Sequence, residues 1–367
     1  WDGRFVSWKK RNGSRFSPWW EQVDRGEYSD DTQLILAVAR SRETGLSWCE
    51  HFARVELPFW MAYERGGGGA TKRAATSWLT GVAPWDSAAK DVAKRYFEAG
   101  GNGAAMRILP HCVAHAGGDE FSAVRRDVLA DAVTTHGHPR ALLGALAFAY
   151  VLWSALRRTE TLDYGYLLRL CAENVDVWGV LPDISDVWPT WQSAAERQLK
   201  DFARTWAGTV SEVVQLARIS VDALEVGLLS DDLEVLKALG GLSVKTNGAG
   251  TVTAVAATYF ASRYAASPAE GLRRAASAFG ADTDTLASMT ASLLGAINGM
   301  PWLKTYQSDL QDGDYIQKTA ETLIFKGKTE SVCDRLEKRD IAAIVAHLRN
   351  PDAVSYTHLR AHETGRN

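Results

Sequence analysis

One stretch near the start of the chain concentrates oxygen ligands. Residues 29–32 read SDDT, so Asp30 and Asp31 stand beside the hydroxyl of Ser29 where a helix is predicted to begin. These residue types also cap helices, and acidic side chains favour the positive end of the helix dipole, so a structural role alone explains them. Neighbouring helical side chains point about 100° apart. If they bind metal, Asp30 and Asp31 would therefore contact two different ions, or one ion and its water.

A second acidic stretch has more carboxylates than a helix cap requires. Residues 282–285 read DTDT after Gly280, and a helical apolar stripe begins at Leu286. Alternate residues of a loop can face one point, as in cation-binding loops built from oxygen ligands. Asp282 and Asp284 could thus share a cation with the first stretch, because four converging carboxylates would otherwise repel one another. Oxygen-only ligands favour Mg²⁺, Mn²⁺ or Ca²⁺ over zinc.

Two glycine-rich segments could bind phosphate through their backbone N–H groups. Residues 66–69 are four glycines, which a flexible turn explains equally simply. Residues 100–103 read GGNG and are followed at once by the helix-forming AAMR of 104–107. The second segment therefore places a predicted helix N-terminus over a glycine loop.

The histidines offer one ligand candidate and two weaker pairs. His136 comes three residues before a predicted helix start, and is either a buried core histidine or a hydrogen-bond partner for a ligand. His111 and His115 have the i,i+4 spacing of helical zinc ligands, as do His358 and His362. We interpret the first pair as a surface helix end and the second as part of a disordered tail.

The composition narrows the classes of partner. The 367 residues include 41 Lys and Arg against 44 Asp and Glu, which gives a formal net charge of -3. A protein that binds the nucleic-acid backbone normally carries a basic surplus, so the sequence argues against that class. A basic pocket for one phosphorylated small molecule remains compatible with this charge.

The cysteines and the apolar runs indicate the cellular location of the protein and whether it spans a membrane. None of the four cysteines, Cys49, Cys112, Cys171 and Cys333, forms a CxxC pair, which argues against a zinc ribbon or a thioredoxin-type motif. A disulfide framework is not expected at this length, so we predict a reducing, cytoplasmic location. The most apolar run, 141–153, is shorter than the roughly 20 residues of a membrane span. It is predicted to be a core helix, and no membrane partner is expected.

The elements that must position these residues are predicted to be helices. Apolar stripes with helical spacing occur near residues 34–39, 92–97, 142–150, 252–260 and 286–297. The best strand-like alternation is the short run 242–246, and residues 1–26 are predicted to be loop. The pattern predicts an all-α fold.

We expect one domain over residues 1–350, with 157–240 as a helical elaboration that carries no chemical motif. Residues 351–367 are predicted to be a disordered or artefactual tail. Because residue 1 is not methionine, we also expect an N-terminal segment to be missing.

The motifs resemble a known family when they are taken together and in order. SDDTQL (29–34), GNGAAMR (101–107), THGHP (135–139) and GADTDT (280–285) resemble the ADP-ribosylglycohydrolase family. That family comprises dinuclear-magnesium enzymes and includes dinitrogenase reductase-activating glycohydrolase. The resemblance implies a single compact multi-helix domain with a central metal cleft.

The resemblance also implies a ligand set and a reaction. Two Mg²⁺ ions, or Mn²⁺, would be held by Ser29, Asp30, Asp31, Asp282, Asp284 and Thr285, with Asp30, Asp31 and Asp284 catalytic. The substrate would be bound by Gly67, Gly68, Gly69, Gly101, Asn102, Gly103 and His136. The implied activity is hydrolysis of the glycosidic bond of an ADP-ribosylated acceptor, which releases ADP-ribose. The expected partners are ADP-ribose or ADP-ribosylated protein, and a nucleic-acid acceptor stays open.

One family feature has no match in the sequence. The family normally opens with a glycine-rich segment of GDALG type followed by a glutamate, and neither Glu21 nor Glu27 stands in that context. The alternative is therefore a catalytically impaired relative that binds ADP-ribose or is structural. A phosphatase or nucleotidase that uses the same metal pair is a third reading.

Overall fold

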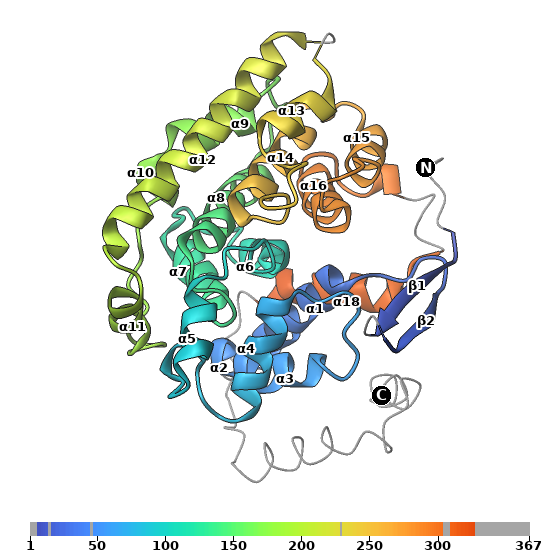
Figure 1. The fold of residues 1–367 in the computed structure, drawn as a ribbon. Helices are drawn as coiled ribbons and strands as arrows, with labels where there is room; N and C mark the ends of the chain where they lie inside the picture. The colour runs from blue at the N-terminus through green and yellow to red at the C-terminus, as the bar shows by residue number, and fades with distance from the viewer. Residues whose placement is uncertain (1–5, 14–15, 45–46, 228–229, 304–308, 327–367) are drawn as a thin grey trace.

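A long apolar helix lies at the centre of a helical protein (Figure 1). The computed structural model describes residues 6–13, 16–44, 47–227, 230–303 and 309–326. Helix α8 (Pro139–Arg157) starts with proline at its first position, and His138 Nδ1 accepts the N–H of Arg140 at 3.1 Å as an N-cap. Fifteen of its 19 residues are buried, as expected for a helix that is apolar all round.

Helix α8 is also long and apolar enough to cross a membrane by length and composition alone. It was the sole helix among the described residues to meet that criterion, and 83% of its apolar window is buried inside the protein. The prediction of a core helix at 141–153 is therefore confirmed.

The remaining helical segments surround α8. In chain order they are α1 (Asp30–Glu43), α2 (Trp48–His51), the π-helical η1 (Phe52–Glu56), α3 (Leu57–Trp60), α4 (Gly69–Leu79), the 3₁₀ turn η2 (Pro84–Asp86), α5 (Lys90–Phe97), the 3₁₀ turn η3 (Ala105–Arg107), α6 (Leu109–Ala114), α7 (Ser122–Ala132), α9 (Tyr166–Glu173), α10 (Val175–Trp178), α11 (Trp191–Gln198), α12 (Phe202–Glu225), α13 (Asp232–Ala238), α14 (Gly250–Arg263), α15 (Pro268–Ala276), α16 (Thr283–Asn298), the 3₁₀ turn η5 (Pro301–Leu303) and α18 (Gly313–Lys326). The predicted all-α class is confirmed, with one small sheet as an exception.

That sheet corrects the prediction of loop over residues 1–26. Strands β1 (Trp8–Gly13) and β2 (Pro18–Val23) pair antiparallel, with Trp8 opposite Val23, at the edge of the molecule (Figure 1). Trp8, Trp19 and Trp20 are all more than half exposed. Because apolar residues stand on the solvent side of this ribbon, the sequence shows no alternation between a buried and a polar face.

Residues 242–246, the best strand-like alternation in the sequence, do not form a strand. These residues form consecutive turns after Gly240, which has φ +80°. The hydroxyl of Thr246 donates to the Gly240 carbonyl at 2.7 Å, and the N–H of Asn247 donates to the Ser243 carbonyl. The apolar side chains of a short run cannot distinguish a strand from a turn when local hydrogen bonds close the turn.

Helices α8 and α14 cross with almost no space between their backbones. A Cβ at Gly144 would lie 2.3 Å from the carbonyl carbon of Gly250, and a Cβ at Gly250 would lie 2.6 Å from the Arg140 carbonyl oxygen. Both positions therefore require glycine. This contact fixes the first residues of α14, and with them the loop that precedes it.

The helical elaboration at 157–240 consists of α9 to α13, and α12 runs along the outer edge of the molecule (Figure 1). Trp178, Trp188 and Trp191 are buried within the core. The predicted domain end at 350, the tail 351–367, Cys333, His358 and His362 lie outside the described residues. Cys49, Cys112 and Cys171 are buried and unpaired.

Candidate metal centre

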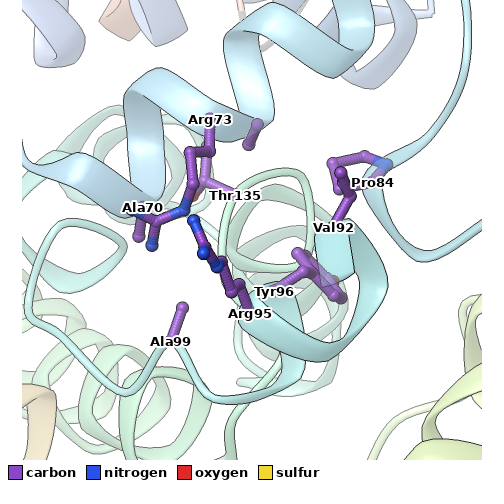
Figure 2. A pocket seen from close by; sticks show the side chains of 9 residues that line it. Ala70, Arg73, Pro84, Val92, Arg95, Tyr96, Ala99 and Thr135 are labelled. Atoms are coloured by element: carbon purple, nitrogen blue, oxygen red, sulfur yellow. The ribbon is translucent and has the colours of Figure 1, made fainter. Parts of the chain in front are cut away.

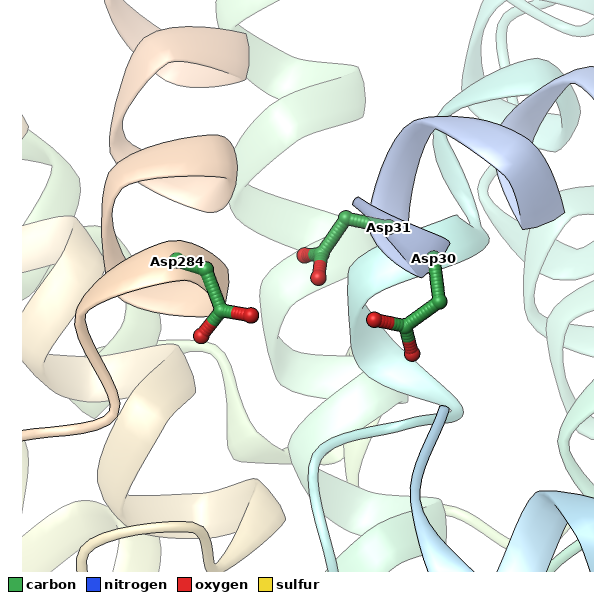
Figure 3. Close-up of side chains that lie close together, drawn as sticks. All are labelled: Asp30, Asp31 and Asp284. Carbon is green, nitrogen blue, oxygen red and sulfur yellow. The ribbon is translucent and has the colours of Figure 1, made fainter. Parts of the chain in front are cut away.

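The two acidic stretches meet although they are 250 residues apart in the sequence. Helices α1 and α16 begin side by side, and carboxylate oxygens of Asp30, Asp31 and Asp284 lie within 4.8 Å of one another (Figure 3). Asp30 and Asp31 are buried, and Asp284 is exposed. The structure thus brings together the residues that the sequence analysis assigned to one cation site.

The start of α1 is fixed by the segment that precedes the glycine run. The N–H of Asp30 donates to the Arg65 carbonyl at 2.9 Å. Gln33, one turn further along α1, donates to the Tyr63 carbonyl at 2.9 Å and accepts the indole N–H of Trp60 at 3.0 Å. These bonds tie the first turn of α1 to residues 60–65, which precede the glycine run.

The start of α16 is tied to both α1 and the second glycine loop. The Thr285 hydroxyl donates to Asp31 Oδ2 at 3.3 Å. The side chain of Asp282, the N-cap residue, makes no capping bond to its own helix and instead accepts from the Asn102 side chain at 2.8 Å. Asp282 is not one of the three carboxylates within 4.8 Å, but it is close enough to raise the pKa of Asp31.

Burial and neighbouring charges raise the pKa values of Asp30, Asp31 and Asp282. Burial, and then the charge of Asp284, raises the pKa of Asp30 to about 7. Burial and the three neighbouring aspartates raise the pKa of Asp31 well above its usual value. Burial also raises the pKa of Asp282 to about 6, although the bond from Asn102 opposes the change. The site therefore concentrates negative charge that its own residues do not neutralise.

The donor set fits a hard divalent cation. The Ser29 and Thr285 hydroxyls both face Asp31 Oδ2, at 3.4 and 3.3 Å, whereas Oδ1 of Asp31 is buried with no hydrogen-bond partner. A buried carboxylate oxygen without a donor is costly unless a cation contacts it. In the described part of the chain, no arginine, lysine or histidine forms an ion pair with these carboxylates. Oxygen ligands alone favour Mg²⁺, Mn²⁺ or Ca²⁺.

The first glycine run lies beside Asp30. A Cβ at Gly66, whose φ is +97°, would lie 3.1 Å from Asp30 Oδ1. A Cβ at Gly67 would lie 2.3 Å from the Trp60 ring, while Gly68 has nothing within 4 Å of the corresponding point and Gly69 begins α4. The run therefore packs against the cluster at one end and leaves open space at the other.

The second glycine loop lies beside Asp282. Gly101 pairs with Ala249 in an isolated bridge, and the N–H of Asn102 donates to the Gly248 carbonyl at 2.9 Å. A short 3₁₀ turn and then α6 follow Gly103, so the single helix start predicted at 104–107 is split in two. The loop is held between the start of α14 and the Asp282 carboxylate, which the Asn102 side chain contacts.

His136 lies under this loop and is neutral. A Cβ at Gly103 would lie 3.1 Å from Cε1 of His136, and Nε2 faces the Gly101 position at 3.8 Å. The Thr135 hydroxyl lies 2.7 Å from His136 Nδ1 and accepts from Arg107 Nη2 at 2.9 Å. Its hydrogen is then free to bond Nδ1, which places the imidazole proton on Nε2. Burial and the charges of Arg107 and Arg73 lower the pKa of His136 to about 3.

The interpretation of His111 and His115 as a surface helix end is wrong for His111, which is fully buried. His111 Nε2 lies 3.0 Å from Asp131 Oδ2, and its Nδ1 lies 2.8 Å from Arg42. His115 is half-buried and lies 2.8 Å from Asp127. The acidic partners come from α7, so the sequence around the histidines could not show them.

Four features of the site have no motif in the sequence. Lys10, on β1, has a positive charge that lowers the pKa of Asp30, and Glu64 has a negative charge that raises it. The loop at 247–249 contributes the carbonyl that holds Asn102. Beside it, Gly101, His138, Lys245 and neighbouring residues line a groove of about 340 Å³. A signal for Glu64 was its position two residues before the glycine run.

The chain resembles known proteins in sequence and in fold. A family model described as ADP-ribosylglycohydrolase matches residues 3–333. A solved structure titled "ADP-ribosylglycohydrolase-related protein complex" is 19% identical, with a TM-score of 0.51 and 82% of each chain covered. At this identity the structural match shows the fold alone. No curated protein matches the chain.

Proposed function

This chain belongs to the ADP-ribosylglycohydrolase family, and on that premise we propose that it hydrolyses the glycosidic bond between ADP-ribose and an acceptor in a reaction that depends on Mg²⁺. The observation that carries the proposal is the group formed by Asp30, Asp31 and Asp284, within which a buried oxygen of Asp31 has no donor. A purely structural helix start does not require three carboxylates within 4.8 Å.

The cations would be held at the two helix starts. The proposed ligands are Ser29, Asp30, Asp31, Asp282, Asp284 and Thr285, for two Mg²⁺ ions or for Mn²⁺ in their place. When bound, such ions neutralise the carboxylates, hold a ribose diol and lower the pKa of a bound water.

The protein's own groups would orient the rest of the substrate. Backbone N–H groups of 66–69 and 101–103 suit phosphate or ribose oxygens, because glycine allows close approach. The Asn102 amide would fix the orientation of the Asp282 carboxylate through their 2.8 Å bond. The neutral imidazole of His136 offers its Nε2–H to a ligand oxygen beside Gly101, and the 340 Å³ groove next to this loop gives room for a nucleotide.

At the reacting end, the catalytic assignments of Asp30, Asp31 and Asp284 follow from position. Their oxygens accept hydrogen bonds, so they can hold a water against the anomeric carbon of the ribose. That carbon becomes oxocarbenium-like as the bond to the acceptor breaks, and nearby negative charge stabilises it. The reaction consumes one water and yields ADP-ribose and the free acceptor.

The test uses Asp284→Asn with Asp231→Asn as its matched control. Both aspartates stand at helix starts, but Asp231 caps α13 in solvent, with bonds to the N–H groups of Leu233 and Glu234. We expect Asp284→Asn to lose Mg²⁺ binding by calorimetry and ADP-ribose release from ADP-ribosylated protein, while Asp231→Asn keeps both. Release of ADP-ribose in EDTA at the rate seen with Mg²⁺, or unchanged Mg²⁺ affinity of Asp284→Asn, would overturn the proposal.

A second candidate function is ADP-ribose binding without turnover. The observation that favours it is Lys10, whose charge acts on Asp30 and competes with a cation there. Calorimetry with ADP-ribose distinguishes the two, since binding of equal affinity in EDTA and in Mg²⁺, without product, supports the binding module. The acceptor class and the cytoplasmic location stay predictions.

A further inference from the structure

A small pocket between α4 and α5 has two arginines at its mouth. Figure 2 shows the side chains of Arg73, from α4, and Arg95, from α5, directed toward each other across it. Its walls are largely apolar and include Ala70 and Ala99, and the Thr135 side chain also lines it. The space behind the guanidinium groups is only about 10 Å³, which is room for little more than a water. A larger ligand group would therefore lie between the two arginines.

Neither guanidinium group has a partner within the described residues. No ion pair, hydrogen bond or ring contact holds Arg73 or Arg95, and none of the nine residues that line the pocket is acidic. Some other surface arginines are paired, as Arg126 is with Asp186 and Arg274 with Glu270. Two cations that face each other without a carboxylate repel, and an anion between them removes that repulsion.

The helix that contributes Arg73 adds to the positive potential. Helix α4 begins at Gly69 after Gly68, which has no side chain to cap it, and Ala70 in its first turn lines the pocket. The first backbone N–H that bonds within this helix end is that of Lys72, to the Gly68 carbonyl at 3.1 Å. The uncapped N–H groups before it carry partial positive charge next to the arginines.

The pocket adjoins the candidate metal centre by two routes. Arg73 Nη1 folds back to 2.9 Å from the Cβ point of Gly69, and Gly66 at the other end of that run contacts Asp30. Three residues span at most about 10 Å, so the arginines and the carboxylates lie on one side of the protein, a short distance apart. In addition, Thr135 lines the pocket and contacts His136, which lies under the second glycine loop.

We propose that Arg73 and Arg95 form an anion subsite that takes a phosphate group of the substrate. The proposal rests on the proposed function for the identity of the substrate, an ADP-ribosyl group whose ribose lies at the carboxylates and whose diphosphate extends past the first glycine run. Planar guanidinium groups suit phosphate because each offers two parallel N–H donors. The subsite binds without metal, which separates it from the carboxylate cluster.

The test measures ADP binding by calorimetry in EDTA for the wild-type protein, Arg73→Gln, Arg95→Gln and the double variant. The matched control is Arg204→Gln, an exposed arginine on α12 with no side-chain partner among the described residues. We expect the dissociation constant for ADP to rise about tenfold for each single variant and about a hundredfold for the double variant. Each substitution removes charged hydrogen bonds to phosphate. Arg204→Gln should bind ADP as the wild type does, and added salt should weaken wild-type binding.

Titrations with two other ligands test whether the subsite recognises the phosphate groups of the substrate. Inorganic pyrophosphate should compete with ADP, and ADP-ribose should show the same dependence on both arginines. Wild-type affinity of the double variant for ADP, no measurable ADP binding by the wild type, or ADP-ribose affinity independent of both arginines would each overturn the proposal. Because these titrations need neither metal nor turnover, they report on the subsite even if the hydrolysis of ADP-ribosylated protein fails.

Discussion

Two groups of aspartates lie in the same helical protein, and the pKa values of their buried members shift in opposite directions. In the acidic cluster, Asp30 and Asp31 with Asp284, burial and mutual repulsion raise the pKa values of the two buried carboxyls. On α7, burial would raise the pKa of Asp131, but Arg107 and His111 outweigh it and hold the pKa below its usual value. Burial alone therefore does not identify a functional carboxylate, whereas burial without a counter-charge does.

The contacts explain the contrast. Asp131 Oδ1 accepts from Arg107 Nε at 2.9 Å, and its Oδ2 lies 3.0 Å from His111. Asp127 accepts from Arg42 at 2.8 Å. The protein's own arginine and histidine side chains thus satisfy the carboxylates of Asp127 and Asp131. The acidic cluster instead leaves Oδ1 of Asp31 without a donor, so its electrostatic cost remains until a cation binds.

The largest expected effect is the loss of stability when Asp131, which is paired with Arg107 and His111, is replaced. Asp131→Asn leaves Arg107 buried beside a neutral amide, and we expect the free energy of unfolding to fall by about 3–5 kcal/mol in urea titrations. The exposed Asp163→Asn is the control and should change stability by less than about 0.5 kcal/mol. A loss below about 1 kcal/mol for Asp131→Asn would mean that the two groups do not differ in the way described.

Magnesium should act on the acidic cluster alone. At a Mg²⁺ concentration 100 times its dissociation constant, we expect the wild-type protein to gain about 2.7 kcal/mol of stability over the same protein in EDTA. Asp131→Asn should keep that gain although it starts from a lower value, and Asp31→Asn should lose it. Thermal unfolding with and without Mg²⁺ measures all three. An equal gain in Asp31→Asn would place the cation elsewhere.

The pH dependence of the metal-free protein should reveal the same contrast. The pKa of Asp30 is raised to about 7 in the folded protein and is about 3.9 in an unfolded chain. The stability that Asp30 contributes to the folded protein is therefore fully present below pH 4 and is lost as the pH rises toward 7. In EDTA above pH 4, the free energy of unfolding of Asp30→Asn, measured in urea, should therefore exceed that of the wild type, by about 2 kcal/mol near pH 5.5. A constant difference from pH 4 to pH 8 would contradict this.

The smallest effect concerns the link from the paired group to the site. Thr135→Val removes the hydroxyl between Arg107 and His136 Nδ1, and we expect about a tenfold higher KM for the ADP-ribosylated substrate with little change in kcat. Thr135→Ser keeps the hydroxyl and should restore the wild-type value. Nitrogen chemical shifts of His136 should show the proton on Nε2 in the wild type and a mixture in Thr135→Val. The same tautomer in both proteins would remove the hydroxyl from the explanation.

The sequence predicts local features of this fold well. The stripes at 142–150, 252–260 and 286–297 lie in helices α8, α14 and α16, because buried helices repeat apolar residues at a period that a single segment displays. The β1–β2 ribbon was missed because its apolar residues face solvent. The alternation at 242–246 forms turns and no strand, because the Thr246 hydroxyl and the Asn247 N–H donate to the carbonyls of Gly240 and Ser243.

The meeting of the two acidic stretches could be expected from their shared residue types, but the partners of each carboxylate could not. The Arg65 carbonyl, the charge of Lys10 and the pair Arg73 and Arg95 come from elements that meet only in three dimensions. For the same reason, nothing near His111 in the sequence shows that Asp131 neutralises it. Which buried charge is paired is a property of packing, and single segments do not contain it.

The crossing of α8 and α14 at Gly144 and Gly250 has a consequence for how new specificities can arise. Where two backbones touch, no rotamer is available to absorb an added methyl group. The displacement would pass to the bond between the Gly250 N–H and the Gly100 carbonyl, 3.0 Å long, and so to the nucleotide groove. Substitutions at the base of that groove therefore disturb its structure. New ligand specificities, whether evolved or engineered, have to come from substitutions at its exposed rim.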